Sequence, residues 1–380
     1  MPLPPLKVLH LFSNSKWTGP AEPVVNACRT LKELGVDITF ACSPKAGSGF
    51  NKVRFMADSY EISCLDFMYL SKHRHPWKNT RDKWTLARHL SSTSYDLIHC
   101  HLDNDHLIAS RVARKKGLPL VRSSYEGVGF PKKRRYKRLL QKTDLLLSPS
   151  HMAREADEQN FGFPSQKAVV IPGVVDTARF KHDPSLPDMR LQWGLGTEHF
   201  IFGIVARMQT HRHYEDLFQA FHKLLQEYPQ ARLVIVGRGT HQERVAFEPV
   251  RRLQIEKEVI FTGYLEEENY TGALAAMDAG IYLTPGSDGT CRAVRELMAM
   301  AVPLVSSDRG MLPELVGHDQ RGLVTDGTPQ ALYEALELMI RDESRRKRYS
   351  EEAEKHGRKH FSLQTYGTAI LEAYNRLLSR

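Results

Sequence analysis

The chain has 380 residues, of which 41% are apolar, and this is enough to bury two hydrophobic cores, so two domains are expected. Its net charge of +9 favours anionic partners such as phosphates, nucleotides or acidic lipids, without choosing between them. The five cysteines are odd in number and lack CxxC spacing, which argues against a disulfide framework and against a zinc site. No run of about 18 apolar residues occurs, and the N-terminus MPLPPLKVLHLF lacks the features of a signal peptide, so we expect a cytoplasmic protein.

Strand-like and helix-like segments alternate from the N-terminus onward. A strand over residues 6–13 comes before a polar loop, a helical pattern over 24–34 ends at Gly35, and the strand VDITFACSP follows. The same order repeats through the strands YDLIHCH, LPLVRSS and TDLLLSPS. This alternation predicts a parallel sheet covered on both faces, with functional residues at the carboxyl ends of its strands. Polar residues at those ends are Asn14 to Gly19, His101, Asp103, Ser123, Ser124, Tyr125, Glu126, Ser148 and Ser150.

A Pro-rich polar stretch, HDPSLPDMRLQWGLG, comes before a second series of the same kind. Strands are predicted over 199–206, 231–236 and 258–262, with an amphipathic helix over 214–227. We therefore predict an α/β protein of two Rossmann-like domains, the first over residues 1–170 and the second over 171–362. The charged C-terminal part is expected to be helical, and its last helix, at about 363–380, is expected to pack back on the first domain.

The stretch from Ile281 to Pro303, IYLTPGSDGTCRAVRELMAMAVP, combines a strand, a tight loop and a helix start. The unpaired N–H groups and the positive dipole end of such a helix suit a phosphate. Asp288 in the loop and Glu296 about two helical turns further on frame this junction. The alternative is an ordinary strand–helix unit with an aspartate that caps the helix.

These motifs, in their order along the chain, resemble the retaining GT-B glycosyltransferases of family 4, also called glycosyl transferases group 1. That family carries P-S-x-x-E-G-F-G-L, three further residues and E-A-M-A-x-G-x-P, where this chain has PGSDGTCR and, after three residues, ELMAMAVP. The segments PGVVDTARF, ARLVIVGRG and RGMLPELV match further family motifs. The resemblance implies the GT-B fold, in which two Rossmann-like domains face each other across a cleft.

The resemblance also implies a donor site that works without a metal or other cofactor. Arginine suits such a site, because its guanidinium group stays charged and can form paired hydrogen bonds with phosphate oxygens. The expected ligands of the donor diphosphate are Arg207, Arg212, Gly289, Thr290, Cys291 and Arg292. Glu296 is implied to accept hydrogen bonds from the ribose hydroxyls, and Asp288 is implied as a catalytic carboxylate near the sugar ring. The alternatives are a solvated basic loop for the arginines and a surface helix carboxylate for Glu296.

Several residues of this stretch depart from the family pattern. Asp288 stands where glutamate is usual, Thr290 and Cys291 replace Phe-Gly, and Arg292 replaces an apolar residue. These changes could alter the donor that is used, or weaken catalysis. Arg295 is expected at the protein surface.

In the first half the resemblance is looser. Gly19 keeps a position for close approach of the backbone to a phosphate, while Pro20 removes an N–H group that the family often has there. Tyr125 stands where a histidine is common, so His101 is the best candidate for a catalytic histidine on the acceptor side, with a packed strand-end histidine as the alternative. Glu126 could orient the acceptor. No dedicated base is expected, because in retaining transfer by this family the leaving phosphate is usually described as taking the acceptor's proton.

The run Lys132 to Arg138, KKRRYKR, contains six basic residues and opens a helical pattern. It could lie on an anionic membrane surface or bind a phosphorylated acceptor, with a solvated face as the alternative. Nucleic acid is not an expected partner, since no recognition motif accompanies the run.

The predicted function is retaining transfer of a hexose from a nucleoside-diphosphate sugar to a cell-envelope glycan, lipopolysaccharide or lipid-linked acceptor. The expected location is the cytoplasm, with peripheral attachment to the inner face of the cytoplasmic membrane as an option. Two alternatives remain open: a partner subunit that binds nucleotide sugars with little activity, and a GT-B-fold sugar-nucleotide epimerase. The sequence leaves the base, the sugar and the acceptor open.

Overall fold

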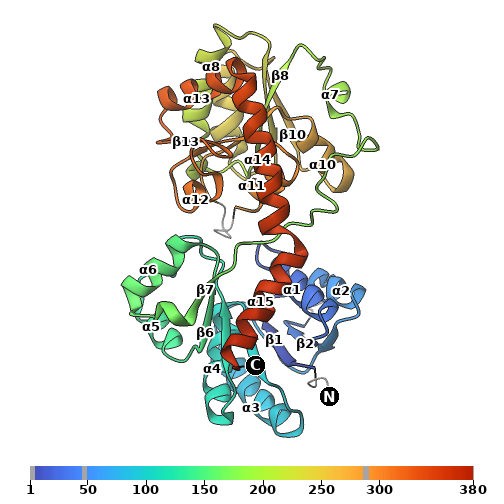
Figure 1. Ribbon diagram of the computed structural model, residues 1–380, viewed down its shortest axis with the longest axis vertical. Coiled ribbons are helices and arrows are strands. Elements are labelled where there is room, and N and C mark those ends of the chain that lie inside the picture. Colours follow the sequence, from blue (N-terminus) through green and yellow to red (C-terminus); the bar gives the residue numbers. More distant parts are fainter. Residues whose placement is uncertain (1–4, 45–48, 286–290, 380) are drawn as a thin grey trace. The chain divides into compact units, whose positions relative to one another are not determined.

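The computed structural model describes residues 5–44, 49–285 and 291–379 (Figure 1). The chain divides into two compact units, one of Met1–Val174 with Leu363–Arg380 and the other of Val175–Ser362. Each unit contains its own parallel sheet. The predicted α/β class with two Rossmann-like sheets is therefore confirmed.

The sheet of the first unit has seven parallel strands in the order β3-β2-β1-β4-β5-β6-β7. Its strands are β1 (Lys7–Phe12), β2 (Asp37–Cys42), β3 (Ser63–Leu65), β4 (Leu97–Cys100), β5 (Leu120–Ser123), β6 (Leu145–Ser148) and β7 (Ala168–Val170). The strand order reverses between β1 and β4, which pair with each other. In open parallel sheets the ligand binds outside the carboxyl ends of the strands at such a reversal.

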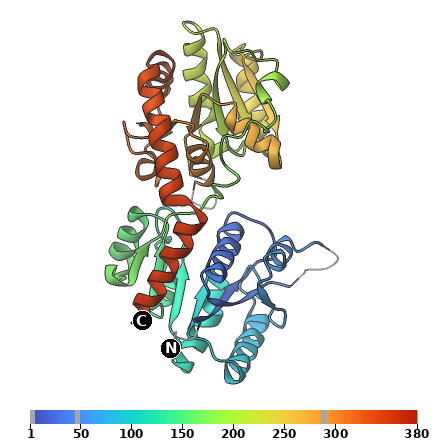
Figure 2. The same cartoon turned by 45° about the vertical axis from the view of Figure 1, so that its right-hand side comes forward.

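Helices cover both faces of this sheet. They are α1 (Ala21–Glu33), α2 (Lys52–Ser59), α3 (Pro76–Ser92), α4 (Asp103–Lys116), α5 (Arg134–Leu140), α6 (His151–Phe161) and α15 (Leu363–Leu377). The last of these comes from the C-terminal end of the chain and lies against α1, as Figures 1 and 2 show. Tyr366, Ile370 and Tyr374 of α15 enter the same hydrophobic core as α1.

The sheet of the second unit has six parallel strands in the order β10-β9-β8-β11-β12-β13. Its strands are β8 (Phe200–Val205), β9 (Ala231–Val236), β10 (Val259–Gly263), β11 (Ala279–Tyr282), β12 (Leu304–Ser307) and β13 (Gly322–Thr325). Its helices are α7 (Met189–Gln192), α8 (Tyr214–Leu225), α9 (Glu248–Arg252), α10 (Glu267–Ala275), α11 (Arg292–Ala299), α12 (Leu312–Val316), α13 (Pro329–Arg341) and α14 (Glu343–Phe361). The order reverses between β8 and β11, which also pair with each other.

Each sheet separates two hydrophobic cores, which explains why most residues of its strands are apolar on both faces. In β1, Val8 and Phe12 enter the core on the side of α1, while Leu9 and Leu11 enter the core on the other side. His10 therefore points toward α1 and α15, because side chains alternate along a strand. None of the described helices is both long and apolar enough to cross a lipid bilayer.

Candidate functional site

The strand ends at the reversal point of the second unit carry the predicted donor residues. Arg207 and Arg212 follow β8, and the loop that follows β11 leads into α11. Asp288, Gly289 and Thr290 lie outside the described residues, so their predicted roles stay predictions. The described part of the site consists of the two arginines, Thr284 and the residues from Cys291 onward.

Arg212 lies on a short 3-10 turn, Thr210–Arg212, and is only 6% exposed. Its Nη1 donates a hydrogen bond to the Thr284 carbonyl oxygen at 2.6 Å, so its side chain links the loop after β8 to the loop after β11. Arg212 Nε and Thr284 Oγ1 are buried and have no hydrogen-bond partner among the described residues. A buried polar group without a partner costs about 1–3 kcal/mol. Such groups are therefore available to a polar ligand.

Arg207 differs from Arg212 in its surroundings. It is exposed to solvent, while its neighbour Met208 is buried in the core. The alternative of a solvated basic loop thus describes Arg207 but not Arg212. The two arginines share one loop, with one guanidinium group anchored and the other free to move toward a ligand.

The N-terminus of α11 lies directly after the undescribed part of the loop. Cys291 is buried, has a left-handed backbone with φ of 52°, and caps the helix without a side-chain hydrogen bond to its first turn. The first N–H groups of a helix have no partner within the helix, and the dipole makes this end attractive for anions. A diphosphate at this end could accept hydrogen bonds from those N–H groups.

Glu296 lies inside the protein and is only 2% exposed, so the alternative of a surface carboxylate is wrong. Its Oε2 accepts a hydrogen bond from the hydroxyl of Tyr270 on α10, and its Oε1 lies 3.2 Å from Arg292 Nε. Burial raises the pKa of Tyr270 well above its usual value, and the negative charge of Glu296 raises it further. Tyr270 therefore stays a neutral donor that holds the carboxylate in place.

Arg292 and Arg295 behave differently from each other. Arg292 is exposed and pairs with Glu296 one helical turn away. The prediction that Arg295 lies at the surface is wrong, because this side chain is 1% exposed and its guanidinium carbon lies 5.9 Å from the centre of the Phe361 ring. Since α11 packs against α14, every residue from Ala293 to Ala299 is buried.

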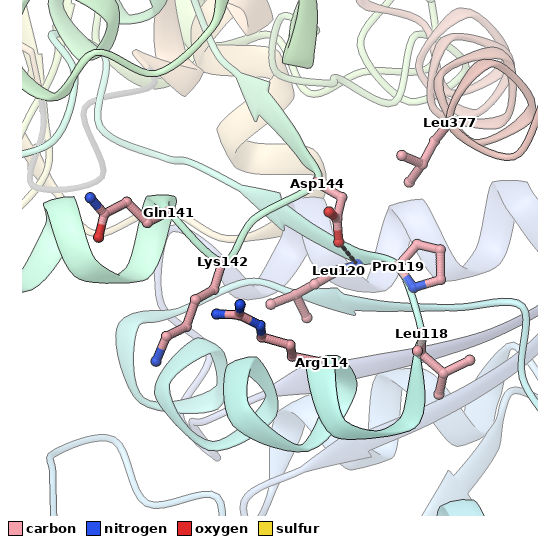
Figure 3. Close-up of a pocket in the computed structure, with 9 residues that line it drawn as sticks. Arg114, Leu118, Pro119, Leu120, Gln141, Lys142, Asp144 and Leu377 are labelled. Atoms are coloured by element: carbon pink, nitrogen blue, oxygen red, sulfur yellow. Dashed lines mark hydrogen bonds between the residues drawn. The ribbon is translucent and has the colours of Figure 1, made fainter.

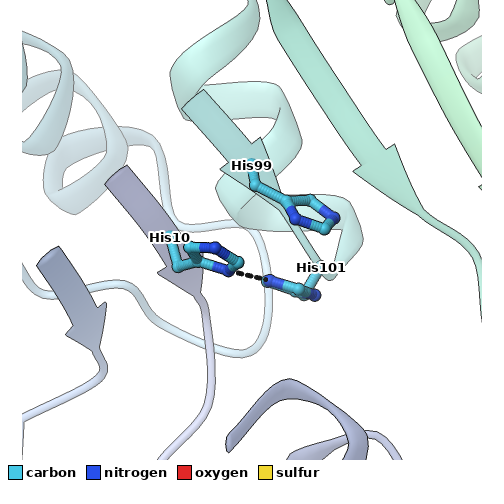
Figure 4. Close-up of side chains that lie close together, drawn as sticks. All are labelled: His10, His99 and His101. Atoms are coloured by element: carbon cyan, nitrogen blue, oxygen red, sulfur yellow. Dashed lines mark hydrogen bonds between the residues drawn. The ribbon is translucent and has the colours of Figure 1, made fainter. Parts of the chain in front are cut away.

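The strand ends of the first unit bring together three histidines that are fully buried, His10 on β1 with His99 and His101 on and after β4 (Figure 4). His10 Nδ1 lies 3.0 Å from His101 Nε2, and His101 Nδ1 lies 2.9 Å from the Tyr125 hydroxyl. The Tyr374 hydroxyl of α15 lies 2.5 Å from His99 Nδ1 and 3.4 Å from His10 Nε2.

His99 Nε2 completes this set with the Ser123 hydroxyl at 2.8 Å. The six groups thus form one chain of hydrogen bonds, which runs Tyr125, His101, His10, Tyr374, His99, Ser123. We call it the histidine chain. A neutral imidazole has one N–H donor and one acceptor nitrogen, and a hydroxyl can do both. With all members neutral, every link is satisfied when all donors point the same way along the chain, or when the donors of both halves point toward Tyr374, whose oxygen then accepts from His10 and from His99.

The histidines of this chain are held neutral by their surroundings. Burial lowers the pKa of His10 to about 3 and lowers the pKa of His99 and His101 well below the usual range. One nitrogen of each ring lies within 4.8 Å of the others, a spacing that a metal ion could bridge. However, all six ring nitrogens already have hydrogen-bond partners, the cluster contains no carboxylate, and the positive charge of Arg122 acts on both His99 and His101. The donor set therefore fits a neutral chain better than a cation.

Two of the predicted acceptor residues, Tyr125 and Glu126, lie at one end of the histidine chain. Tyr125 is half-buried and is its terminal member, and Glu126 next to it is exposed. Gly19 lies half-buried in the turn before α1. His101 has no exposed surface and lies behind Tyr125. This burial matches the alternative interpretation of His101 as a histidine packed at the end of a strand.

The sequence analysis missed His10, His99 and Tyr374 in the first unit and Tyr270 in the second. A signal existed for His99, since histidines two residues apart in a strand point to the same face. No local pattern links Tyr270 to Glu296, which lies 26 residues further along the chain.

Comparison with known families gives two matches that together span most of the chain. Residues 18–179 match the family model described as Glycosyltransferase Family 4, and residues 187–356 match the one described as Glycosyl transferases group 1.

Among curated proteins, the chain is similar to the putative teichuronic acid biosynthesis glycosyltransferase TuaC of Bacillus subtilis, with 27% identity over 203 residues that cover 53% of this chain and 48% of that protein. It is also similar to the GDP-mannose-dependent alpha-(1-6)-phosphatidylinositol monomannoside mannosyltransferase of Mycobacterium tuberculosis, with 28% identity over 202 residues that cover 50% and 51% of the two chains. The chain thus spans about half the length of these two curated relatives.

Solved structures match over nearly the full length of both chains. Anabaena HepE in complex with UDP and glucose gives a TM-score of 0.78 at 18% identity and covers 98% of this chain and 100% of its own. The lipopolysaccharide outer core galactosyltransferase WaaB gives 0.73 at 17% identity with 97% and 99% covered. A putative UDP-N-acetylglucosamine 2-epimerase from Listeria monocytogenes gives 0.62 at 12% identity with 99% and 97% covered. At these identities the likeness shows the GT-B fold alone.

Proposed function

Since the chain belongs to glycosyltransferase family 4, the glycosyl transferases group 1, we propose that it transfers a hexose from a nucleoside-diphosphate sugar with retention of configuration. The observation that carries this proposal is the buried Glu296, which Tyr270 and Arg292 hold in place about one turn into α11. A buried carboxylate of this kind is a costly feature that serves a polar ligand better than it serves packing.

The donor diphosphate gains negative charge as the bond to the sugar breaks, and catalysis requires that this charge be stabilised. Arg212 would bind it from a fixed position, since Thr284 already holds one end of its guanidinium group. Arg207 would close on it from solvent, and the N-terminus of α11 would offer N–H groups. These groups neutralise the charge without a metal ion in the proposed scheme.

Glu296 would bind the ribose of the donor. A carboxylate has about four lone-pair positions, so it can accept from ribose hydroxyls in addition to Tyr270 and Arg292. Asp288 would lie near the sugar, and this role rests on the resemblance alone.

On the acceptor side, we propose that Tyr125 and Glu126 contact the acceptor and that Gly19 lets the backbone approach it. His101 would act as a positioning residue, because it is buried and holds the Tyr125 hydroxyl at 2.9 Å. In this scheme the leaving phosphate takes the proton of the acceptor hydroxyl, so no protein base is assigned.

We propose a cell-envelope glycan or a lipid-linked sugar as the acceptor class. The supporting relatives are named for teichuronic acid, phosphatidylinositol mannoside and lipopolysaccharide core biosynthesis, the last one a Rhizobium leguminosarum mannosyltransferase. Their names and the matched structures include both GDP-mannose and UDP donors, so the base stays open. Such acceptors place the enzyme at the cytoplasmic face of a membrane.

The basic residues from Lys132 to Arg138 could contribute to such a membrane contact by charge alone. They are exposed at all six basic positions, and Arg135 lies 3.2 Å from Asp103. The apolar side of α5 is not available for insertion, because Tyr136, Leu139 and Leu140 are buried in the protein.

Two other functions remain as alternatives, the partner subunit and the epimerase. The GT-B fold is compatible with both, as the likeness to the putative epimerase shows. The family match favours the transferase, whereas the departures at Thr290 and Arg292 are the reason for considering a weakly active subunit. An experiment must therefore decide between these functions.

The test combines nucleotide binding with turnover. A thermal-shift panel of UDP, GDP, ADP and their sugars should identify one base that raises the melting temperature, because a ligand that binds only the native state stabilises it. Donor hydrolysis and transfer are then measured for the wild type, for Glu296→Ala and for the control Glu352→Ala, which removes an exposed carboxylate from the same unit. We expect turnover in the wild type and the control, and its loss in Glu296→Ala. Tight nucleotide binding without turnover would support the partner subunit, and interconversion of sugar epimers would support the epimerase.

A further inference from the structure

An aromatic and basic stripe runs along the solvent side of α3 in the first unit. Trp77, Arg81, Trp84 and Arg88 follow one another at spacings of four, three and four residues, which places them on one face of the helix. Trp77 is 61% exposed and Trp84 is 63% exposed. Large exposed aromatic groups that recur on one face indicate a surface that binds something. We call these four residues the α3 stripe.

The stripe is an ordered surface and not a set of loose side chains. The Arg88 guanidinium lies 5.7 Å from the centre of the Trp84 ring. Trp77 packs near Tyr69 with 5.8 Å between ring centres, and Arg81 lies 4.9 Å from the centre of the Tyr69 ring. The aromatic rings and the positive charges are thus interleaved along the helix.

The charge around the stripe has one sign. From Lys72 to Arg88 the sequence contains six lysine or arginine residues and one acidic residue, Asp82. Asp82 is 1% exposed, and its carboxylate accepts hydrogen bonds from the backbone N–H groups of Tyr69 and Leu70. The exposed charges of this segment are therefore all positive.

The basic surface continues from α3 onto its neighbours. The pKa of Lys83 is lowered, first by partial burial and then by the positive charges of Arg111, Arg74 and Lys142. The pKa of Lys142 is lowered by burial and by Arg111 and Arg114. Such crowding of like charges costs free energy that an anionic partner would offset.

A cavity of about 410 Å³ lies at the far end of this surface, where Arg114 of α4 and Lys142 lie next to each other (Figure 3). Leu118, Pro119 and Leu377 form its apolar side. Its acidic residue, Asp144, accepts a hydrogen bond from the Leu120 N–H at 2.9 Å. The cavity lies at the amino end of β5, away from the strand ends that carry the candidate acceptor residues.

We propose that the α3 stripe and the adjoining basic residues of α4 dock the protein on an anionic lipid bilayer, with Trp77 and Trp84 in the headgroup layer. Tryptophan is enriched at that layer because its ring is apolar and its N–H is polar. The mixture of aromatic rings and cations over two helices fits an extended anionic plane better than a single bound anion. The α3 stripe supplies the apolar contact that α5 lacks, and vesicle binding does not depend on the transfer reaction proposed above.

The first test is sedimentation of the full chain with phosphatidylcholine vesicles, with and without phosphatidylglycerol. We expect binding to the anionic vesicles only. Arg81→Gln with Arg88→Gln should weaken it about 30-fold, since each basic residue near the surface contributes about a fivefold factor. The control Lys133→Gln with Arg134→Gln removes two exposed charges at the start of α5, and we expect a smaller loss. Equal losses of vesicle binding for the two pairs would show that binding depends on net charge and not on the position of the charges. This result would overturn the specific role of the α3 stripe.

The second test asks whether the tryptophans enter the bilayer. Vesicles with brominated acyl chains should quench the fluorescence of the wild type, and this quenching should be lost in Trp77→Ser with Trp84→Ser. Both positions are mostly exposed, so the variant should keep the melting temperature of the wild type. Unchanged quenching and unchanged vesicle binding in this variant would refute the proposal. The proposal would also be refuted if this variant kept vesicle binding but lost self-association or binding to an anionic polysaccharide. The α3 stripe would then bind a second copy of the chain or a polysaccharide.

Discussion

Tyr374→Phe removes a single oxygen atom from the centre of the histidine chain. Its hydroxyl lies 2.5 Å from His99 Nδ1 and 3.4 Å from His10 Nε2, and all three residues are fully buried. The phenylalanine ring keeps the volume of the tyrosine ring, so the packing of α15 against α1 should survive. The variant divides the chain of six groups into two separate parts. It leaves His99 Nδ1 and His10 Nε2 without a hydrogen-bond partner.

The expected cost follows from these two distances. A buried polar group that loses its partner costs about 1–3 kcal/mol. The contact with His10 is long, at 3.4 Å, so we assign it the low end of this range. We therefore expect a loss of about 2–4 kcal/mol in the free energy of unfolding of the first unit. At about 2–4 °C per kcal/mol for a unit of this size, the melting temperature should fall by several degrees.

The assay is urea unfolding at pH 7 with a matched tyrosine-to-phenylalanine control. Tyr69→Phe removes a hydroxyl that accepts a hydrogen bond from the exposed Arg81, so water can replace the lost partner and little stability should be lost. Nitrogen chemical shifts of the histidine rings should also show three neutral imidazoles in the wild type. The reasoning is refuted if Tyr374→Phe costs no more than Tyr69→Phe, or if any ring of the chain is protonated at pH 7.

Three further predictions concern the donor site, a tight turn and the effect of pH. Arg212→Lys should weaken nucleotide binding about 10-fold or more in calorimetry, because lysine cannot bond Thr284 and form paired bonds with a phosphate together. Gly239→Ala should lower the melting temperature far more than Gly117→Ala, because the Cβ at Gly239 would lie 1.9 Å from the Met208 carbonyl oxygen, whereas a Cβ at Gly117 meets open space and adds only the strain of its left-handed φ of 66°. His10, with a pKa of about 3 when folded and 6.5 when unfolded, stabilises the fold fully above pH 6.5. As the pH falls from 6.5 toward 3, the unfolded chain takes up the proton first, so urea unfolding should show a loss of about 1.4 kcal/mol per pH unit from this residue.

The two sheets could be predicted because parallel strands with both faces buried leave a strong sequence signal. Runs such as LVIV and LLL are apolar throughout, and glycines such as Gly35 end the helices between the strands. The segment from 51 to 94 received no prediction, and α3 shows why. Its tryptophans face solvent while Asn79 and Asp82 are buried, so its hydrophobic pattern points away from the core.

The candidate donor site was only partly predictable, because motifs fix positions along the chain and not the surroundings of each side chain. The motif placed Glu296 at its position, but its burial depends on Tyr270 of α10 and on the packing of α11. Arg295 was assigned to the surface since arginine is rarely buried, yet α14 covers the helix on which it lies. Arg207 and Arg212, five residues apart in one loop, differ in exposure because Arg212 turns inward to bond the Thr284 carbonyl oxygen.

The histidine chain gives the C-terminal helix a role that packing alone does not explain. Without the Tyr374 hydroxyl, His99 and His10 would each keep a buried nitrogen with no partner, and three neutral histidines in one core would be costly. The direction of the chain also decides what Tyr125 offers to a ligand. When the donors point toward Tyr125, His101 donates to the Tyr125 oxygen and leaves the Tyr125 proton free for an acceptor oxygen. When they point the other way, Tyr125 donates to His101 and presents only a lone pair. Tyr125 keeps its proton free only when Tyr374 donates to His10, so the orientation of the Tyr374 hydroxyl couples the C-terminal helix to the hydrogen-bonding character of the proposed acceptor residue.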